Sequence, residues 1–112
     1  MTPFAFSILT PAGSRTLDDA VFVGVRTVEG ALGVLAKHAP MIAACPAGVV
    51  RVQNAGGWSY FAASAGILTT DGKQVSMLSG YAEPADSEDA ARATIASWQR
   101  EMAEEADSDQ AH

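Results

Sequence analysis

The sequence contains a single cysteine, Cys45, among its 112 residues. One thiol excludes an internal disulfide framework and is typical of a protein from a reducing compartment. No apolar run approaches the roughly 18 residues of a membrane span. The start of the chain also lacks the basic segment and following apolar segment of a secretory signal. The sequence therefore predicts a soluble, intracellular protein with no direct membrane span.

Clusters of Lys and Arg are also missing. Seven basic residues stand against thirteen acidic ones, which gives a net charge of −6. Residues 1–82 carry five bases and four acids, whereas residues 83–112 carry nine acids and two bases. This distribution offers no basic footprint for phosphate neutralisation, so it argues against nucleic acid as a partner. It separates an electrically balanced body from an acidic tail.

The apolar residues of the body alternate with a period of two, which is typical of half-buried strands. Short turn sequences separate these runs. Asp71-Gly72 predicts a tight type I′ hairpin, which needs positive φ at both residues. Many short strands with such turns predict a small antiparallel sandwich or barrel. In each of two runs, three apolar residues are predicted to lie on one face of a strand: Phe4, Phe6 and Ile8 in the first, and Val21, Val23 and Val25 in the second.

After Pro84 the pattern becomes that of a helix, with Asp86 or Ser87 as its predicted N-cap. We expect its apolar stripe to dock the helix onto the sandwich or onto a neighbouring subunit, with a mobile regulatory helix as the alternative. The expected organisation is a sandwich over residues 1–84, one helix over 85–107 and a disordered tail over 108–112. The stripe comprises Ala91, Ile95, Trp98, Met102 and Ala106.

Cys45 and His38 are the two residues that suggest chemistry, as a nucleophile and its base. No third residue is placed to orient the imidazole, and Cys45 lies in an apolar run, so we interpret it as a small buried hydrophobe. One internal His and one Cys do not make a metal site. The residues alone indicate a small interaction domain with no visible active site and no cofactor. A small enzyme that uses these two residues stays as an alternative.

Residues 29–40, EGALGVLAKHAP, resemble the loop that marks the epsilon subunit of F-type rotary ATP synthases, E-G-x-L-G-[IV]-L-P-G-H-A-P. Ala36-Lys37 replaces the usual Pro-Gly, and Ala65 replaces the first glycine of the family's G-G-F-L motif. Both departures concern local turn geometry. Four further segments resemble family motifs in the same order, so the similarity spans nearly the whole chain: Leu9–Gly13, Ala47–Arg51, Ala65–Leu68 and Val75–Glu83.

The resemblance implies a mainly β fold, a flattened antiparallel β-sandwich of about ten strands followed by one C-terminal α-helix. It implies a non-catalytic central-stalk subunit without cofactors that binds the gamma subunit and rests on the c ring. Such a subunit passes ion-driven rotation of the ring to gamma, within a complex that also contains the catalytic alpha and beta subunits. The expected location is peripheral, on the cytoplasmic face of a bacterial inner membrane. A free-standing regulatory or scaffold module with the same sandwich is the alternative.

The resemblance also implies roles for individual residues, although the glycines, His38 and Pro40 could instead mainly hold the loop in shape. Asp89 and Arg92 match a segment that binds ATP in some members with arginines from a second helix. This chain has room for one helix only, so the pair is a candidate for weak nucleotide binding at most. The loop facing the c ring would contain Glu29, Gly30, Ala31 and Gly33, and the segment facing gamma would contain Lys37, His38, Ala39 and Pro40.

Overall fold

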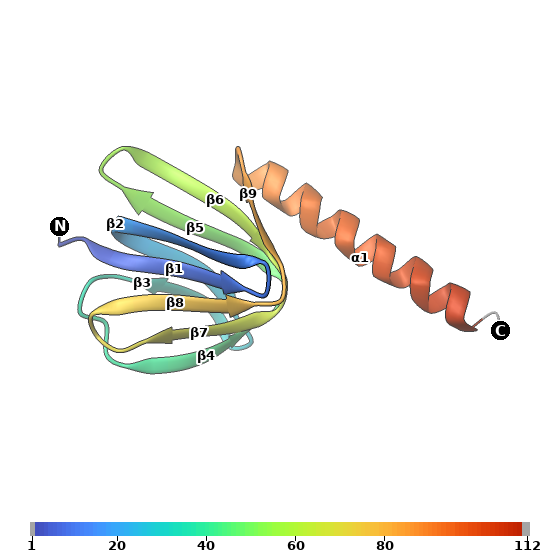
Figure 1. The fold of residues 1–112 in the computed structure, drawn as a ribbon, viewed down its shortest axis with the longest axis horizontal. Helices are drawn as coiled ribbons and strands as arrows, with labels where there is room; N and C mark the ends of the chain where they lie inside the picture. The colour runs from blue at the N-terminus through green and yellow to red at the C-terminus, as the bar shows by residue number, and fades with distance from the viewer. Residues whose placement is uncertain (1, 111–112) are drawn as a thin grey trace.

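The computed structural model describes residues 2–110, with the side chains of residues 2–103. Within this range the chain forms nine strands and one helix (Figure 1), one strand fewer than the resemblance implies. The fold is mainly β with a C-terminal helix, as predicted. The elements are β1 (Phe4–Thr10), β2 (Gly13–Thr27), β3 (Gly30–Val34), β4 (Met41–Cys45), β5 (Gly48–Asn54), β6 (Gly57–Ala63), β7 (Gly66–Thr70), β8 (Gln74–Ser79), β9 (Ala82–Ala85) and α1 (Glu88–Gln110).

The strands hydrogen-bond in the order β4-β7-β8-β1-β2-β5-β6-β9, and β3 pairs with β2. The sheet folds over on itself, which places β4, β7, β8 and β1 in one layer and β3, β5, β6 and β9 in the other (Figure 1). β1 and β8 run parallel. All other pairs are antiparallel, so the structure departs from the predicted antiparallel sandwich in this one pair.

β2 joins the two layers because its halves belong to different ones. Its first half pairs with β1, and its second half pairs with β5 and β3. The register shifts twice near Ala20, which is fully buried at the corner. Such bulges bend a strand and add a residue to one face. The predicted alternation of Val21, Val23 and Val25 is therefore wrong at its start, since Val21 is only half-buried whereas Val23 is buried.

One hydrophobic core fills the space between the layers. The predicted inward face of β1 is confirmed, because Phe4, Phe6 and Ile8 are 6%, 0% and 3% exposed. Strands of both layers supply the largest fully buried side chains, so both layers depend on the same core. These side chains are Phe6, Val23, Val34, Val50, Val52, Leu68 and Met77.

The turn between β7 and β8 differs from the predicted hairpin. Gly72 has a φ of +92°, but Asp71 is not among the residues with positive φ, so the turn is not of type I′. The Oδ1 atom of Asp71 instead accepts hydrogen bonds from the backbone N–H groups of Lys73 at 2.8 Å and Gln74 at 2.9 Å. A side-chain acceptor thus shapes the turn where the prediction relied on backbone geometry.

Helix α1 begins at Glu88 after Ser87, whose Oγ accepts a hydrogen bond from the N–H of Ala90 at 3.0 Å. This confirms Ser87 as the N-cap. The predicted helix ended at residue 107, and the observed one is described to Gln110; the disordered tail over residues 108–112 stays a prediction. Residues 111 and 112 lie outside the described residues.

The first half of the apolar stripe docks α1 onto the sandwich. Ala91 and Ile95 are buried against Ala62 of β6, and Trp98 packs edge-to-face on Tyr81 with ring centroids 5.1 Å apart. Met102 is 69% exposed, so docking ends before it. The side chain of Ala106 lies outside the described residues.

The structure explains why Ala65 can replace a glycine but Gly66 is retained. A Cβ on Gly66 would collide with the carbonyl oxygen of Leu78 in β8, whereas Ala65 is exposed. We expect Gly66→Ala to lower the free energy of unfolding by about 1–3 kcal/mol, because the neighbouring backbone must shift. Urea denaturation measures this change. The control is Gly80→Ala, whose Cβ would meet only Ser64 Oγ at 3.5 Å; equal stability of the two variants would contradict the explanation.

Candidate functional site

The turn between β2 and β3 contains residues predicted to face the c ring. The Thr27 hydroxyl donates to the carbonyl oxygen of Gly30 at 3.0 Å and accepts from the N–H of Glu29 at 3.1 Å. Gly30 has a φ of +129°, which L side chains rarely adopt. Glu29 is exposed, and the neighbouring Val28 is 72% exposed. Thr27 and Gly30 therefore hold the turn in shape, while Glu29 and Val28 form its accessible surface.

Gly33, also predicted to face the c ring, lies beneath an aromatic ring. It pairs with Gly24 of β2. A Cβ at Gly33 would lie 2.7 Å from Cε2 of Phe22, and one at Gly24 would lie 3.0 Å from Cε1. The close approach of this ring accounts for glycine at position 33 without any partner. Ala31, two residues earlier on β3, is exposed.

The residues predicted to face gamma form the connection from β3 to β4. The N–H of His38 donates to the carbonyl oxygen of Leu35 at 3.3 Å, which closes a four-residue turn. Lys37 has a φ of +62°, the only positive value for a non-glycine residue within the described part of the chain. The family pattern has glycine here. The left-handed backbone is thus kept although the glycine is not.

This connection lies at the opposite end of the sandwich from the β2–β3 turn (Figure 1). The carbonyl oxygen of His38 lies against the β7–β8 turn, 3.8 Å from where a Cβ of Gly72 would be. The imidazole Nδ1 of His38 lies 2.8 Å from the carbonyl oxygen of Ala39. Ala39 and Pro40 are exposed, and His38 is half-buried. The structure therefore keeps the two predicted surfaces apart.

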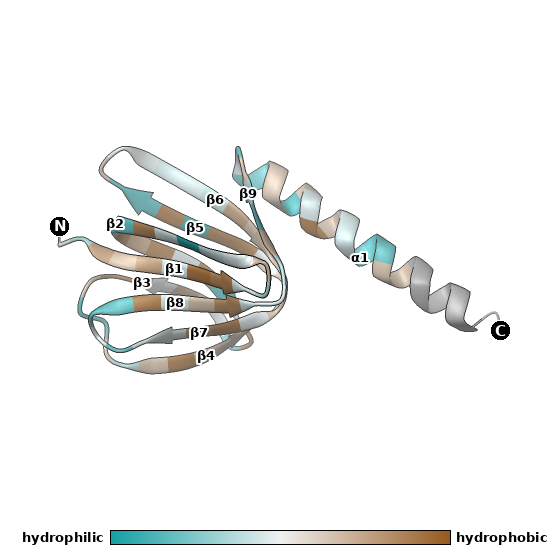
Figure 2. Ribbon diagram, viewed as in Figure 1, coloured by the Kyte–Doolittle hydropathy of each residue, from teal (hydrophilic) through white to brown (hydrophobic). Residues whose placement is uncertain are grey.

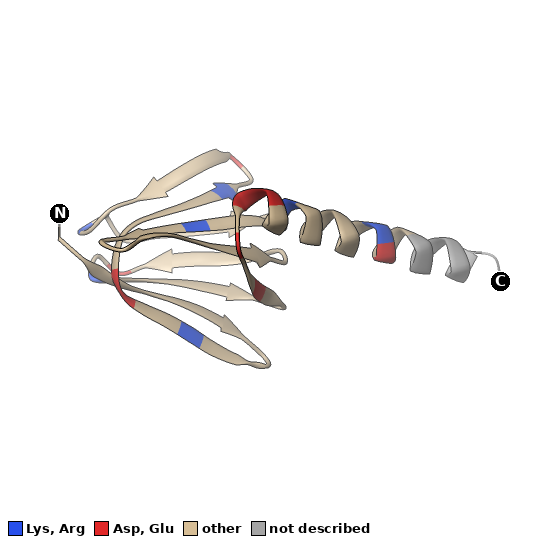
Figure 3. Cartoon of the chain, turned by 90° about the horizontal axis from the view of Figure 1, so that it is seen from above, with Lys and Arg blue, Asp and Glu red and all other residues tan. Residues whose placement is uncertain are grey.

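The candidate nucleotide-binding pair lies at the start of α1, where acidic residues gather (Figure 3). Nη2 of Arg92 lies 2.8 Å from Oε2 of Glu88, but its Nη1 lies 3.9 Å from Oδ1 of Asp89. Glu88 also lies 3.6 Å from Nε of Arg51, across a cleft of about 380 Å³ between α1 and the sandwich. The Asp89 side chain is 97% exposed. Arg92 is thus engaged mainly by Glu88, and nucleotide binding stays a prediction.

The outer face of one layer has no charged residue and carries a group of exposed apolar side chains. Strands β1, β4, β7 and β8 contain no charged residue, and Figure 2 shows hydrophobic segments along them. Register aligns one exposed row across these strands, with a further exposed apolar side chain at its edge. Exposure reaches 78% at Ile42 and 57% at Leu78. We call this set the apolar face: Leu9, Ile42, Ala44, Ile67 and Leu78.

Sequence reasoning missed the apolar face because it assigned apolar residues to the core. The sequence of β4 nevertheless indicates this face. β4 reads MIAAC, in which outward and inward positions are both apolar. A strand with one face in water normally alternates with polar residues. An uninterrupted apolar run in a small sandwich therefore indicates a second covered face.

Cys45 and His38 do not form a catalytic pair. His38 precedes β4 and Cys45 is its last residue, and a strand of this length separates its ends by about 13 Å at about 3.3 Å per residue. Burial raises the pKa of the Cys45 thiol, which disfavours the nucleophilic thiolate. The enzyme alternative based on these two residues is therefore wrong.

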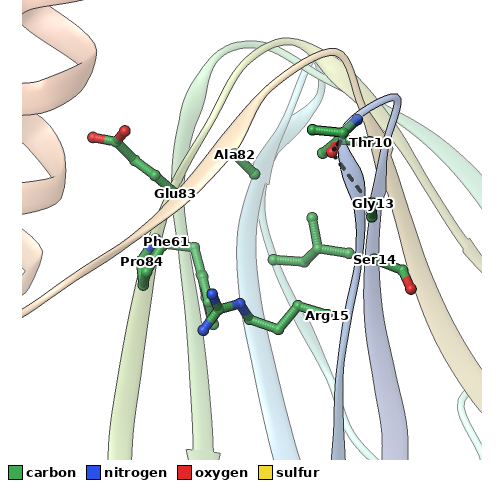
Figure 4. Close-up of a pocket in the computed structure, with 10 residues that line it drawn as sticks. Thr10, Gly13, Ser14, Arg15, Phe61, Ala82, Glu83 and Pro84 are labelled. Atoms are coloured by element: carbon green, nitrogen blue, oxygen red, sulfur yellow. Dashed lines mark hydrogen bonds between the residues drawn. The ribbon is translucent and has the colours of Figure 1, made fainter.

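A pocket of about 200 Å³ opens at the end of the sandwich between β1, β2, β6 and β9 (Figure 4). The Arg15 guanidinium lies over the ring of Phe61, 5.9 Å from its centroid. Glu83 accepts a hydrogen bond from the Tyr81 hydroxyl at 2.9 Å, and this bond raises the pKa of Tyr81. Arg15 and Glu83 are thus engaged separately. They do not form an acid–base pair.

Among the described side chains of residues 2–103, no group of three or more His, Cys, Asp or Glu gathers in a way that could hold a metal ion. No helix within residues 2–110 is long and apolar enough to span a membrane.

The sequence is similar to known ATP synthase chains. Residues 3–85 match the family model described as ATP synthase, Delta/Epsilon chain, beta-sandwich domain. The ATP synthase epsilon chain of Bacillus pumilus is 37% identical over 95 residues, which cover 85% of this chain and 72% of that one. The epsilon chain of Desulforudis audaxviator is 38% identical over 87 residues, covering 78% of this chain and 64% of the relative.

Solved structures share the fold. A chain of the Euglena gracilis mitochondrial ATP synthase, in an OSCP/F1/c-ring structure, superposes with a TM-score of 0.68 at 21% identity, covering 75% of this chain and 54% of that chain. A chain of the Tetrahymena thermophila central stalk and c ring gives a TM-score of 0.62 at 13% identity, covering 73% of this chain and 66% of that one. At these identities the likeness shows the fold alone.

The left-handed backbone at Lys37 gives a direct test of the β3–β4 turn. We expect Lys37→Val to lower the free energy of unfolding by about 1–2 kcal/mol, because a β-branched side chain clashes in this region. The control is Lys73→Val, since Lys73 is an exposed turn lysine without positive φ. Thermal unfolding of both variants measures the difference. A Lys37→Val protein as stable as the control would show that the turn has another backbone geometry.

Proposed function

This chain belongs to the family of ATP synthase delta and epsilon chains that share a beta-sandwich domain, and we propose that it acts as the non-catalytic, epsilon-type subunit of the central stalk. In this role it binds the gamma subunit and the c ring. It couples ion-driven rotation to ATP synthesis or hydrolysis. The apolar face carries the proposal, because it supplies a surface that needs a protein partner.

The apolar face is the proposed gamma-binding surface. Contiguous exposed apolar patches on soluble proteins commonly mark interaction sites, and burial stabilises a complex by roughly 25 cal/mol per Å² of apolar area. The face has no charge to desolvate, since its four strands carry none. The connection formed by Lys37, His38, Ala39 and Pro40 leads directly into β4 at the edge of this face. The predicted gamma-facing segment therefore meets the apolar face at Ile42.

The β2–β3 turn is the proposed contact with the c ring. It presents Glu29 and Val28 at the other end of the sandwich from residues 35–40. A single core lies between the layers that carry these two segments. Because packed cores deform little, force applied at one end can be transmitted to the other. Two contact surfaces joined by one rigid core are what a coupling subunit requires.

The catalytic alpha and beta subunits supply the chemistry in this proposal. The separation of Cys45 from His38, and the separate engagement of Arg15 and Glu83, support a non-catalytic role. Contact with the c ring would place the chain peripherally at the cytoplasmic face of a bacterial cell membrane. Helix α1 projects from the end of the sandwich that carries the β2–β3 turn (Figure 1).

Binding to an alpha-beta-gamma subcomplex that lacks epsilon tests the proposal. We expect Leu78→Asp to weaken binding at least tenfold, because it buries an unpaired carboxylate in the apolar face. The control is Met102→Asp, at a position 69% exposed on α1, beyond the docked half of the helix. This control should bind gamma like the unaltered chain. Surface plasmon resonance measures the affinities.

Two results would contradict the proposal. One is an unaltered chain that does not bind the subcomplex. The other is a folded Leu78→Asp variant that binds as tightly as the Met102→Asp control, which would remove the apolar face as the gamma-binding surface. Because both positions are exposed in the free chain, neither substitution disturbs the core.

A further inference from the structure

Strand β4 is an edge strand without the usual protection. It pairs with β7 on one side only. Its five residues include no charge and no proline, and Ile42 is 78% exposed. Natural proteins normally protect sheet edges with charges, prolines or bulges, because free backbone groups invite another strand. β9, at the other end of the strand order, contains both Glu83 and Pro84. β4 is thus an unprotected edge, as is β3, which pairs with β2 alone.

The backbone groups of Ile42 and Ala44 point toward this open side. The carbonyl oxygen of Ala44 accepts a hydrogen bond at 3.0 Å from the N–H of Val28, which does not belong to β7. In an antiparallel strand the N–H and C=O of one residue share a side, and successive residues alternate. Ile42, two residues before Ala44, therefore points the same way.

The register of β7 supports the same assignment. The N–H of Asp71 donates to the carbonyl oxygen of Gln74 in the turn to β8. By alternation, Thr69 and Ile67 then point toward β8, while Thr70, Leu68 and Gly66 point toward β4. Those three residues pair with Met41, Ala43 and Cys45. The backbone N–H and C=O groups of Ile42 and Ala44 therefore point toward the open side.

A backbone donor already occupies one position of this edge. Val28, from the β2–β3 turn, fills the place of a strand residue beside Ala44. Next to it, a groove of about 330 Å³ runs between this turn and β4, lined by Val28, Ala31, Met41 and Ile42 among others. The N–H and C=O of Ile42 and the N–H of Ala44 face this side. The edge thus has one acceptor, two donors and space for an added strand.

We propose that an extended segment of the gamma subunit adds to the open edge of β4 as a further strand. This inference rests on the proposed function, and it adds backbone hydrogen bonding to the apolar contact. Strand addition derives affinity from main-chain hydrogen bonds and specificity from alternate side chains. The segment is uncharged where it lies beside Ile42, because the apolar face has no group to pair with a buried charge. The open edge of β4 is continuous with the gamma-binding surface, since Ile42 belongs to both.

A proline at position 42 tests the hydrogen bond directly. Ile42→Pro removes the outward N–H, and Ile42→Ala removes the same side chain but keeps that N–H. We expect Ile42→Pro to bind the alpha-beta-gamma subcomplex about tenfold more weakly than Ile42→Ala, because an acceptor on gamma is left unpaired. Both variants should unfold at similar temperatures, since proline is tolerated where the N–H faces away from the sheet. Ala43→Pro, which loses a bond to β7, should unfold at a lower temperature.

The outcomes separate this inference from the proposed function. If the unaltered chain binds and Leu78→Asp weakens binding, but Ile42→Pro and Ile42→Ala bind equally, strand addition is overturned and the proposed function stands. If the unaltered chain does not bind, both fail. Amide hydrogen exchange of the unaltered chain gives a second reading that needs no variant. The N–H groups of Ile42 and Ala44 should exchange at least tenfold more slowly in the complex, and unchanged exchange would contradict strand addition.

Discussion

The corner in β2 is the constraint on which the rest of the structure depends. One strand of 15 residues serves both layers, and its two register shifts let it fold over at the buried Ala20. A strand without these shifts would keep its direction and leave a single open sheet. The corner therefore creates the sandwich, the shared core and the two ends at which the turns gather.

Closing the core determines which residues remain outside. Once Phe6, Val23 and Leu68 face inward, strand alternation forces Leu9, Ile67 and Leu78 outward, although they are apolar. The same folding places the β2–β3 turn and the β3–β4 connection at opposite ends. An apolar outer face and two separated contact segments thus follow from one arrangement. The proposed coupling role uses all three.

Sequence patterns correctly predicted the structural features that depend only on residues close together in the chain. The inward face of β1 and the Ser87 cap follow from alternation and helix-end chemistry, and the structure confirms both. Other features depend on distant contacts. The bulges near Ala20 arise where β2 changes partners. The left-handed backbone at Lys37 could be inferred only from the family's glycine, since nothing in the lysine itself favours that conformation. The apolar run of β4 signalled a second covered face, but the alignment of the apolar face across four strands depends on which strands meet.

The most direct measurement of the central claim is recovery of the tagged chain from gently solubilised membranes of its own host. Partners would be identified by mass spectrometry. The account predicts that gamma, the catalytic subunits and the c ring are recovered together with the chain. Recovery of the chain alone, or with unrelated proteins, would contradict it and favour a free-standing scaffold module built on the same sandwich.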